Sequence, residues 1–96
     1  MIYVNELSSQ PELGYPQVTC MIWSDTSKDE LIDFMKSIHV HGFTVFYIHF
    51  THIDMRIEYC RLTPSQRERA ISNNACYLLF EEYVELREKG YQYRLF

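Results

Sequence analysis

The chain has 96 residues, of which 47% are hydrophobic and 16% aromatic, and its formal net charge at pH 7 is −4. This length fits a single domain over residues 1–96, and many aromatic residues with a mild net charge exclude a disordered chain. The negative balance also argues against nucleic-acid binding through a broad basic face.

The cysteines and the apolar segments indicate where in the cell the protein works. Three cysteines without a C-x-x-C pair predict reduced thiols instead of a disulfide framework or a zinc site. The start, MIYVNELSSQ, lacks the basic and apolar regions of a signal peptide. The longest apolar run, in FTVFYIHF, is far shorter than the roughly 20 residues that span a bilayer. We therefore expect a cytoplasmic protein with no membrane contact and no cofactor.

The first third of the chain alternates strand and loop signals. Apolar and polar residues alternate over 2–7, which predicts a short strand. Residues 8–17 carry two prolines and a glycine among polar residues, which predicts a surface loop. Residues 18–23, VTCMIW, are nearly all apolar and predict a strand well inside the sheet.

The clearest helix follows. Ser27 and Glu30 form a capping-box pattern that begins it. Apolar residues then recur at helical spacing, at Leu31, Phe34, Met35 and Ile38. Gly42 ends the connection to the next strand.

Two strands and a second helix come next. FTVFYIHF, residues 43–50, is apolar on both faces and predicts a central strand. Residues 54–60 alternate charged and apolar side chains, which predicts an outer strand or extended arm. A second helix begins after Thr63, with Pro64 in its first position, Gln66 completing a capping box and Asn73–Asn74 as a left-handed stop.

The last part predicts a buried strand over 76–80 and a third helix over 81–90, with Tyr83 and Leu86 facing inward and Gly90 past its end. Residues 91–96, YQYRLF, predict a terminal strand or a docking tail. Strands separated by helices favour a single-domain α/β sandwich, with a mixed sheet of about five strands and three helices.

All four histidines lie within residues 39–52. His39 and His41 fall at a helix end and its loop, whereas His49 shares a strand face with Tyr47 and His52 lies past that strand. Metal binding by residues three apart needs a helix or a tight turn, and this segment is too β-prone for a helix. The pattern therefore favours histidines at element ends, with a metal site as the minor alternative.

Arginines gather around the start of the second helix. A helix N-terminus with nearby guanidinium groups is suited to bind a phosphate or a carboxylate. The alternative is a solvated helix in which Arg67 and Arg69 flank Glu68. The candidate anion-binding residues are Arg61, Thr63, Ser65 and Arg67, with Asp25 nearby.

The third helix carries a run of glutamates on the side away from its apolar positions. A solvated face explains such a run, and the functional alternative is a surface that meets a basic partner. The candidate partner-binding residues are Glu81, Glu82, Glu85, Glu88, Tyr91 and Tyr93.

Three segments together resemble the domain of unknown function 4031 family. CMIWSDTSKDELIDFM is similar to its strand followed by S-D/A-D and E-L-x-x-F. RLTPSQRERAISNNA resembles its L-T-P-S-x-R-x-R-A motif, and IYVNEL resembles its V-Y-V-D start. The likeness covers most of residues 2–80 and implies a small protein of bacteria or their phages, in a family without an established activity.

The chain departs from the family pattern at its ionisable positions. The family has an acid where this chain has Asn5, histidines where it has Met21 and Ile32, and a His-Tyr-Asp triplet aligned with residues 59–61. Such a set would suit metal-assisted hydrolysis or acid–base chemistry. Of the family's acids and histidines only Asp25, in the S-D motif, remains in this chain. Such a loss is the pattern of a fold that is reused without its chemistry.

These features lead to two main hypotheses, besides a weaker third, nucleic-acid binding through the arginine segment, which the negative net charge disfavours. The first is a small non-catalytic interaction protein, encoded by a phage, that binds and modulates a host or defence protein in the host cytoplasm. The second is a nucleotide- or phosphoester-binding module, or a metal-assisted hydrolase, that uses the anion site. Homo-oligomerisation stays open.

Overall fold

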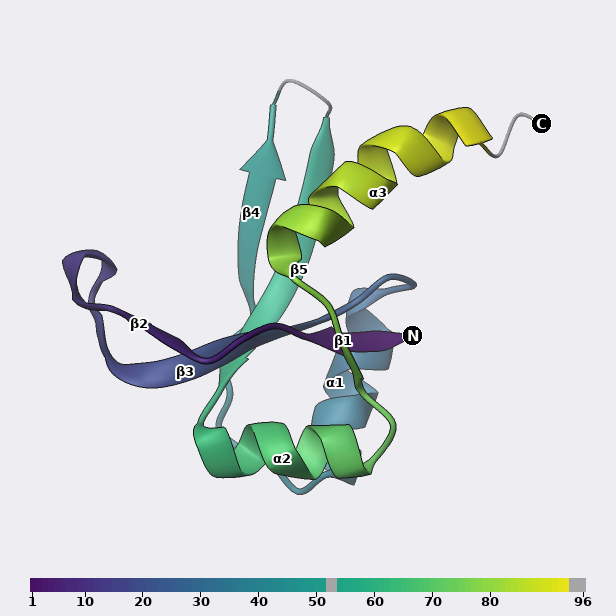
Figure 1. Cartoon of the computed structure of the whole chain (residues 1–96). Helices are drawn as coiled ribbons and strands as arrows, with labels where there is room; N and C mark the ends of the chain where they lie inside the picture. Colours follow the sequence, from purple (N-terminus) through teal and green to yellow (C-terminus); the bar gives the residue numbers. More distant parts are fainter. Residues whose placement is uncertain (52–53, 94–96) are drawn as a thin grey trace.

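A twisted mixed β-sheet forms the centre of the protein. The structure, a computed structural model, describes residues 1–51 and 54–93 (Figure 1). In chain order its elements are β1 (Ile2–Val4), β2 (Ser8–Gln10), a 3₁₀ turn η1 (Pro11–Leu13), β3 (Tyr15–Ser24), α1 (Lys28–Ser37), β4 (Phe46–Phe50), β5 (Met55–Leu62), α2 (Pro64–Ser72), β6 (Cys76–Tyr77) and α3 (Phe80–Tyr93).

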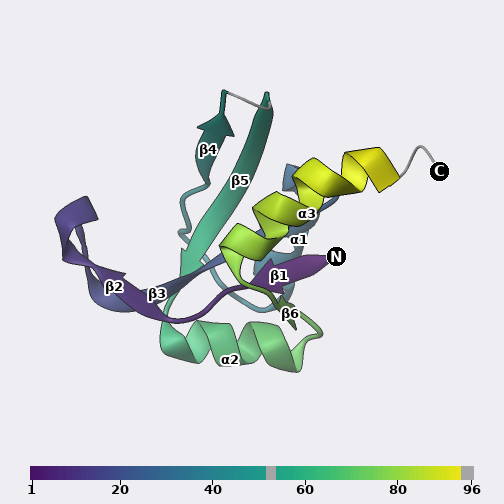
Figure 2. The same ribbon diagram turned by 45° about the horizontal axis from the view of Figure 1, so that its top comes forward.

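The strand order is β4-β5-β3-β1-β6, with β2 paired to β3 off this path. The β1–β6 pair, visible in Figure 2, is parallel, and the other pairs are antiparallel. The expected single α/β domain with a mixed sheet and three helices is therefore confirmed, with six strands in the described residues instead of about five.

One face of the sheet packs against α1 and α2 through aliphatic side chains. Alternate residues of the strands supply this aliphatic core, including Val4 on β1, Ile22 on β3 and Leu62 on β5, each 0% exposed. Leu31 and Met35 of α1 are also 0% exposed, which confirms the predicted apolar stripe. The other residues of this core are Ile2, Cys20, Ile38, Val40, Cys60, Ala70 and Ala75.

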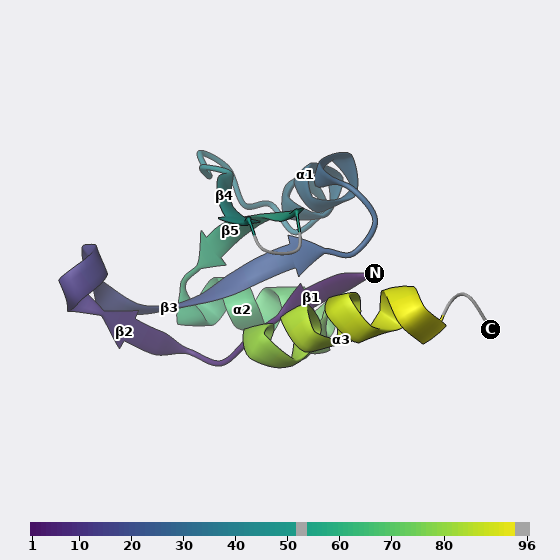
Figure 3. The same cartoon turned by 90° about the horizontal axis from the view of Figure 1, so that it is seen from above.

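The opposite face of the sheet carries an aromatic cluster covered by α3. Trp23 lies at its centre, 5.2 Å from the ring of Phe80 in an edge-on arrangement and 5.4 Å from the ring of Tyr83. Tyr3 adds a stacked ring at 6.0 Å from Trp23. Seen from above, α1 and α3 lie on opposite sides of the strands (Figure 3), so the two clusters are separated by the sheet.

The two predicted capping boxes differ in the structure. At α2 the box is complete, because Gln66 N donates to Thr63 Oγ1 at 3.3 Å and Thr63 N donates to Gln66 Oε1 at 2.9 Å. At α1 only half forms: Glu30 N donates to Ser27 Oγ, while the Glu30 carboxylate accepts from Ser24 instead of returning to Ser27. The predicted left-handed stop is confirmed at Asn74, whose φ is 75°.

The predicted positions of two strands were wrong. Residues 43–50 were expected to be central, but β4 is an edge strand, and β5 lies between β4 and β3. The two halves of β5 have different neighbours, since residues 55–59 pair with β4 and residues 59–62 pair with β3. Each half of β5 is therefore paired on one side, with Tyr59 paired on both, and the charged residues Arg56 and Glu58 stand in the half that pairs with β4.

The loop predicted over residues 8–17 is instead an arm of the sheet, in which Ser8 pairs with Thr19 and Gln10 with Tyr15. At the other end, the strand predicted over 76–80 has only two residues, both exposed, and α3 begins at Phe80. That helix continues through Gly90 to Tyr93, past its expected end. Tyr83 is buried as predicted, whereas Leu86 is 59% exposed. Residues 94–96 lie outside the described part of the chain.

Candidate functional site

Four of the five candidate anion-binding residues gather at the start of α2. Thr63 Oγ1 and Ser65 Oγ are 3.3 Å apart. The two arginines beside them are already engaged, since Arg61 Nε donates to Thr19 Oγ1 and Arg67 Nε donates to the Asn5 carbonyl, each at 3.0 Å. The capping box also uses Thr63 Oγ1, so several donors of this cluster already have partners within the fold.

Asp25, the fifth candidate, lies elsewhere. Arg61 stands opposite Met21 on β3, four residues before Asp25, which is about 13 Å along an extended strand. Asp25 instead lines a small hollow of about 130 Å³ with Lys28, Arg56 and Arg87, between the end of β3, β5 and α3. The prediction that Asp25 lies near the candidate anion-binding residues at the start of α2 was therefore wrong.

Asp25 and Glu30 together bind the backbone nitrogen of Met1. Its ammonium group is 3.0 Å from Asp25 Oδ1 and 2.8 Å from Glu30 Oε1. Glu30 also accepts from the Ser24 hydroxyl at 2.7 Å, and Asp25 accepts from Tyr3 Oη at 3.4 Å.

These contacts lower the pKa of both carboxyl groups. Burial acts to raise the pKa of Asp25, but hydrogen bonds from the Met1 ammonium and Thr26 outweigh it, so the pKa is lowered from its usual value. Hydrogen bonds from the Met1 ammonium and from Ser24 lower the pKa of Glu30. The same contacts, with Glu30 contributing most, raise the pKa of the Met1 amine. All three groups are therefore held in their charged forms.

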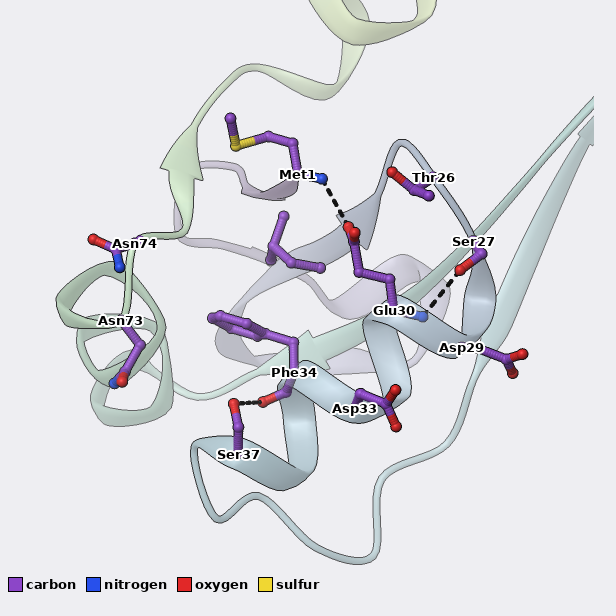
Figure 4. Close-up of a pocket in the computed structure, with 11 residues that line it drawn as sticks. Met1, Thr26, Ser27, Asp29, Glu30, Asp33, Phe34, Ser37, Asn73 and Asn74 are labelled. Carbon is purple, nitrogen blue, oxygen red and sulfur yellow. Dashed lines mark hydrogen bonds and ion pairs between the residues drawn. The ribbon is translucent and has the colours of Figure 1, made fainter.

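An acid-rich groove lies beside this ion pair (Figure 4) and was not anticipated from the sequence. It has a volume of about 710 Å³. In Figure 4, Glu30 reaches from α1 to Met1, while Asp29 and Asp33 stand on the outward side of the same helix. Phe34 of α1 and the Asn73–Asn74 turn line the groove from other sides. The sequence could have indicated that Asp29 and Asp33 lie one helical turn apart on the same helix. It could not show that the end of α2 lies beside them, because that depends on the fold.

The described histidines occupy the ends of elements, as predicted. His39 follows α1 with a φ of 59°, and His41 is exposed in the connection to β4. His49 is exposed on β4 on the same face as Tyr47, with Nε2 3.5 Å from Asp54 Oδ1. His52 lies outside the described residues. Within residues 1–51 and 54–93, no group of three His, Cys, Asp or Glu residues could hold a metal ion.

The cysteines are unpaired and differ in access. Cys20 and Cys60 are buried in the aliphatic core, and Cys76 is exposed on β6. Burial raises the pKa of Cys20 to about 11, despite the opposing effect of the Arg67 and Arg61 charges. Burial alone raises the pKa of Cys60 to about 11. Both buried thiols stay protonated at neutral pH, which makes them poor nucleophiles.

The candidate partner-binding residues lie along α3. The four glutamates among them are exposed; Glu81, Glu85 and Glu88 occupy the side of the helix away from the buried Tyr83, and Glu82 lies at the flank of that side. Leu86 stands one turn after Glu82 and is 59% exposed. Tyr91 and Tyr93 belong to the last turn of α3, and their side chains lie outside the described part of the structure.

Three of the positions at which the resemblance implies a different residue are neighbours. Asn5 is buried, and its Oδ1 accepts from Met21 N at 2.6 Å. Arg61 stands opposite Met21 on the adjacent strand. Ile32 lies on α1 and is half-buried. Asn5 now joins the end of β1 to β3, which is a structural role for a position where the resemblance implies an acid.

Comparisons with protein-family models, with curated proteins and with solved structures gave no match. The resemblance to the domain of unknown function 4031 family therefore stays a prediction. No helix in the described residues has the length and apolar character required to cross a membrane.

Proposed function

We propose that this protein is a non-catalytic interaction protein that binds another protein through the outward face of α3. The ionisable groups that could carry chemistry are occupied in ways that favour a structural role. Asp25 and Glu30 bind the Met1 nitrogen, Arg67 bonds the Asn5 carbonyl, and Cys20 is buried with a raised pKa. The exposed features that remain for a function are surfaces that could meet another protein.

The observation that carries the proposal is the way α3 leaves the body of the fold. Tyr83 is 6% exposed, but every side chain from Glu85 to Glu88 is exposed, and the helix continues to Tyr93. In Figure 1 its yellow half extends beyond the sheet. A few helical turns without packing are marginally stable in water, so a second surface would stabilise this half.

The exposed side chains of α3 indicate which kind of partner surface would fit them. Glu81, Glu85 and Glu88 form an acidic face, and Leu86 adds an exposed apolar residue beside Glu82. A helix of this kind fits a basic surface that contains an apolar depression. That the partner is a host or defence protein of a phage-infected cell rests on the family resemblance and is part of the proposal.

The test compares two doubly charge-reversed variants with equal net charge. Glu85→Lys with Glu88→Lys alters the distal half of α3, and Asp33→Lys with Glu68→Lys alters exposed acids on α1 and α2. We expect a partner captured by the wild type to be lost by the α3 variant and retained by the control. Equal retention by both variants, or a measured enzymatic turnover by the purified chain, would contradict the proposal.

A second candidate function is phosphate-ligand binding at the start of α2. It is favoured by the contact of the Thr63 and Ser65 hydroxyls, 3.3 Å apart, in a segment that Arg61 and Arg67 flank in the sequence. A ligand at one hundred times its dissociation constant adds about 2.7 kcal/mol to the free energy of unfolding. Thermal-shift measurements with nucleotides, with and without divalent metals, test it: a shift that Ser65→Ala reduces supports the site, and no shift removes it.

A further inference from the structure

We propose that the edge strand β4 pairs with the β4 of a second copy of this chain, which joins two sheets into one across a two-fold axis. This surface is distinct from the α3 face, so the inference goes beyond the interaction proposed above. It begins from the strand order, in which β4 stands at the end next to β5. In Figures 1 and 2 no strand or helix of the described residues runs along its outer side.

An edge strand ordinarily carries a feature that blocks pairing with other chains, such as a lysine, a proline or a bulge. β4, with the sequence FYIHF, carries none of these, and its register with β5 is unbroken from Phe46 to Phe50. The arm formed by β2 and β3 does have a register shift, between Ser8 and Gln10. β6 has only two residues. Among the described edges, β4 is thus suited to pair.

The sequence of β4 reads nearly the same in both directions around Ile48. In an antiparallel pair centred there, Ile48 faces Ile48 of the second copy and Phe46 faces the second copy's Phe50. This row of apolar residues extends into β5, where Ile57 stands opposite Ile48. Cross-strand pairs of apolar and aromatic residues stabilise a sheet. A second copy therefore fits this edge on its apolar face.

On the opposite face of β4, the same pairing brings no two acidic or two basic side chains opposite each other. Tyr47 and His49 are exposed there, with Glu58 opposite Tyr47 and Arg56 opposite His49 on β5. The same pairing sets Tyr47 against the second copy's His49. Each row across the joined sheet then runs from Glu58 of one copy to Arg56 of the other, so both rows end in opposite charges.

The contact is small. A single pair of five-residue strands falls in the class of weak interfaces, below about 1,200 Å² of buried surface. We therefore expect a reversible dimer whose population rises with concentration. Sedimentation equilibrium of the wild type over a range of concentrations should detect it.

Two double variants that share Tyr47→Lys test the register. With His49→Glu, each row alternates in sign through Glu58, Lys, Glu and Arg56, and the dimer should strengthen. With His49→Lys, two lysines face each other, and the dissociation constant should exceed that of the first variant by about tenfold or more, a difference that high salt reduces. Circular dichroism and the emission of Trp23 confirm that both variants are folded.

A cysteine placed on the axis gives an independent measurement. In a Cys76→Ser background, Ile48→Cys should form a disulfide-linked dimer under mild oxidation, because facing residues of antiparallel strands lie within disulfide reach. Tyr47→Cys is the matched control, since it is displaced diagonally from its equivalent and should link poorly. A wild type that stays monomeric at every concentration, equal association of the two lysine variants, or equal cross-linking at 47 and 48 would each overturn the proposal.

Discussion

The two faces of the sheet are closed to different degrees. The aliphatic core draws on three strands and two helices, and Val4, Ile22, Leu31, Met35 and Leu62 are all 0% exposed. In the aromatic cluster Trp23, Ile57 and Tyr83 are buried, and the described residues packed around them are only partly buried, under a single helix. The difference implies that most of the stability lies on the α1–α2 side. The α3 side can then open locally without unfolding the domain.

Thiol access gives the largest contrast between the two sides. Cys20 and Cys60 belong to the aliphatic core, so their reaction with a thiol reagent requires opening of that core. For a domain of ordinary stability this slows the reaction by about a thousandfold or more relative to Cys76. Stopped-flow labelling should show one fast thiol, absent in Cys76→Ser, and two slow ones. Three fast thiols would contradict the closed core.

The same thiols make stability depend on alkaline pH. Burial raises the folded-state pKa of Cys20 and Cys60 to about 11, above the usual 9.0. Their contribution is therefore fully present below pH 9 and is lost as the pH rises toward 11. Urea midpoints should fall across that interval, and Cys20→Ala with Cys60→Ala should flatten the fall. An unchanged slope in the double variant would show that other groups cause it.

Truncation in the aliphatic core should cost the most free energy of unfolding. Leu31→Ala removes a side chain with no exposure and leaves a cavity beneath α1, which predicts a loss of about 2–5 kcal/mol in urea unfolding. Leu86→Ala is the matched control, because Leu86 is 59% exposed, and should change stability by less than about 0.5 kcal/mol. Similar losses at the two leucines would mean that the core is less closed than its burial implies.

Truncation on the α3 side should cost less and act locally. Tyr83→Ala removes the buried anchor of α3, but the helix can relax into solvent, so we expect a loss of about 1–2 kcal/mol. Trp23, the single tryptophan, lies 5.4 Å from the Tyr83 ring and should shift its emission to longer wavelength. Loss of far-ultraviolet helix signal before the main urea transition would identify α3 as a separate unit, and one shared transition would refute that.

The smallest predicted effect is at the start of α2. Thr63→Ala removes the side-chain half of the complete capping box and should lower the free energy of unfolding by about 1 kcal/mol. Thr44→Ala, at an exposed position between α1 and β4, is the control and should change little. A loss no larger than that of the control would show that the Gln66 half of the box suffices.

The features that the sequence predicts well are local ones. The start of α2 depends on four consecutive residues, and Thr63, Pro64 and Gln66 occupy the expected positions. The grouping of Arg61, Thr63, Ser65 and Arg67 was also predictable, because all four lie within residues 61–67, where β5 leads directly into α2. Asp25 could not be placed with or apart from them without knowing how β3 runs past β5.

The features that the sequence missed depend on which strands become neighbours. β4 looks central because its residues are almost all apolar, yet Tyr47 is 59% exposed and supports Arg56, whose guanidinium lies 4.0 Å from the ring centroid. β5 looks peripheral because Arg56 and Glu58 stand in the half that does not reach β3. The pattern of apolar residues describes one strand at a time, so it does not show whether that strand lies at the edge or in the middle of the sheet.

The parallel pairing of β1 with β6 has a consequence for how the chain is made. The strand at residues 2–4 is held on one side by β3, and its other side finds a partner only at residues 76–77. During synthesis, the sheet that contains β1 cannot be complete until residues 76–77 have left the ribosome. Contacts so distant in sequence slow the search for the native state. Until β6 has been made, the edge of β1 with which it pairs stays open, and in this period a chaperone or a second nascent chain can bind there.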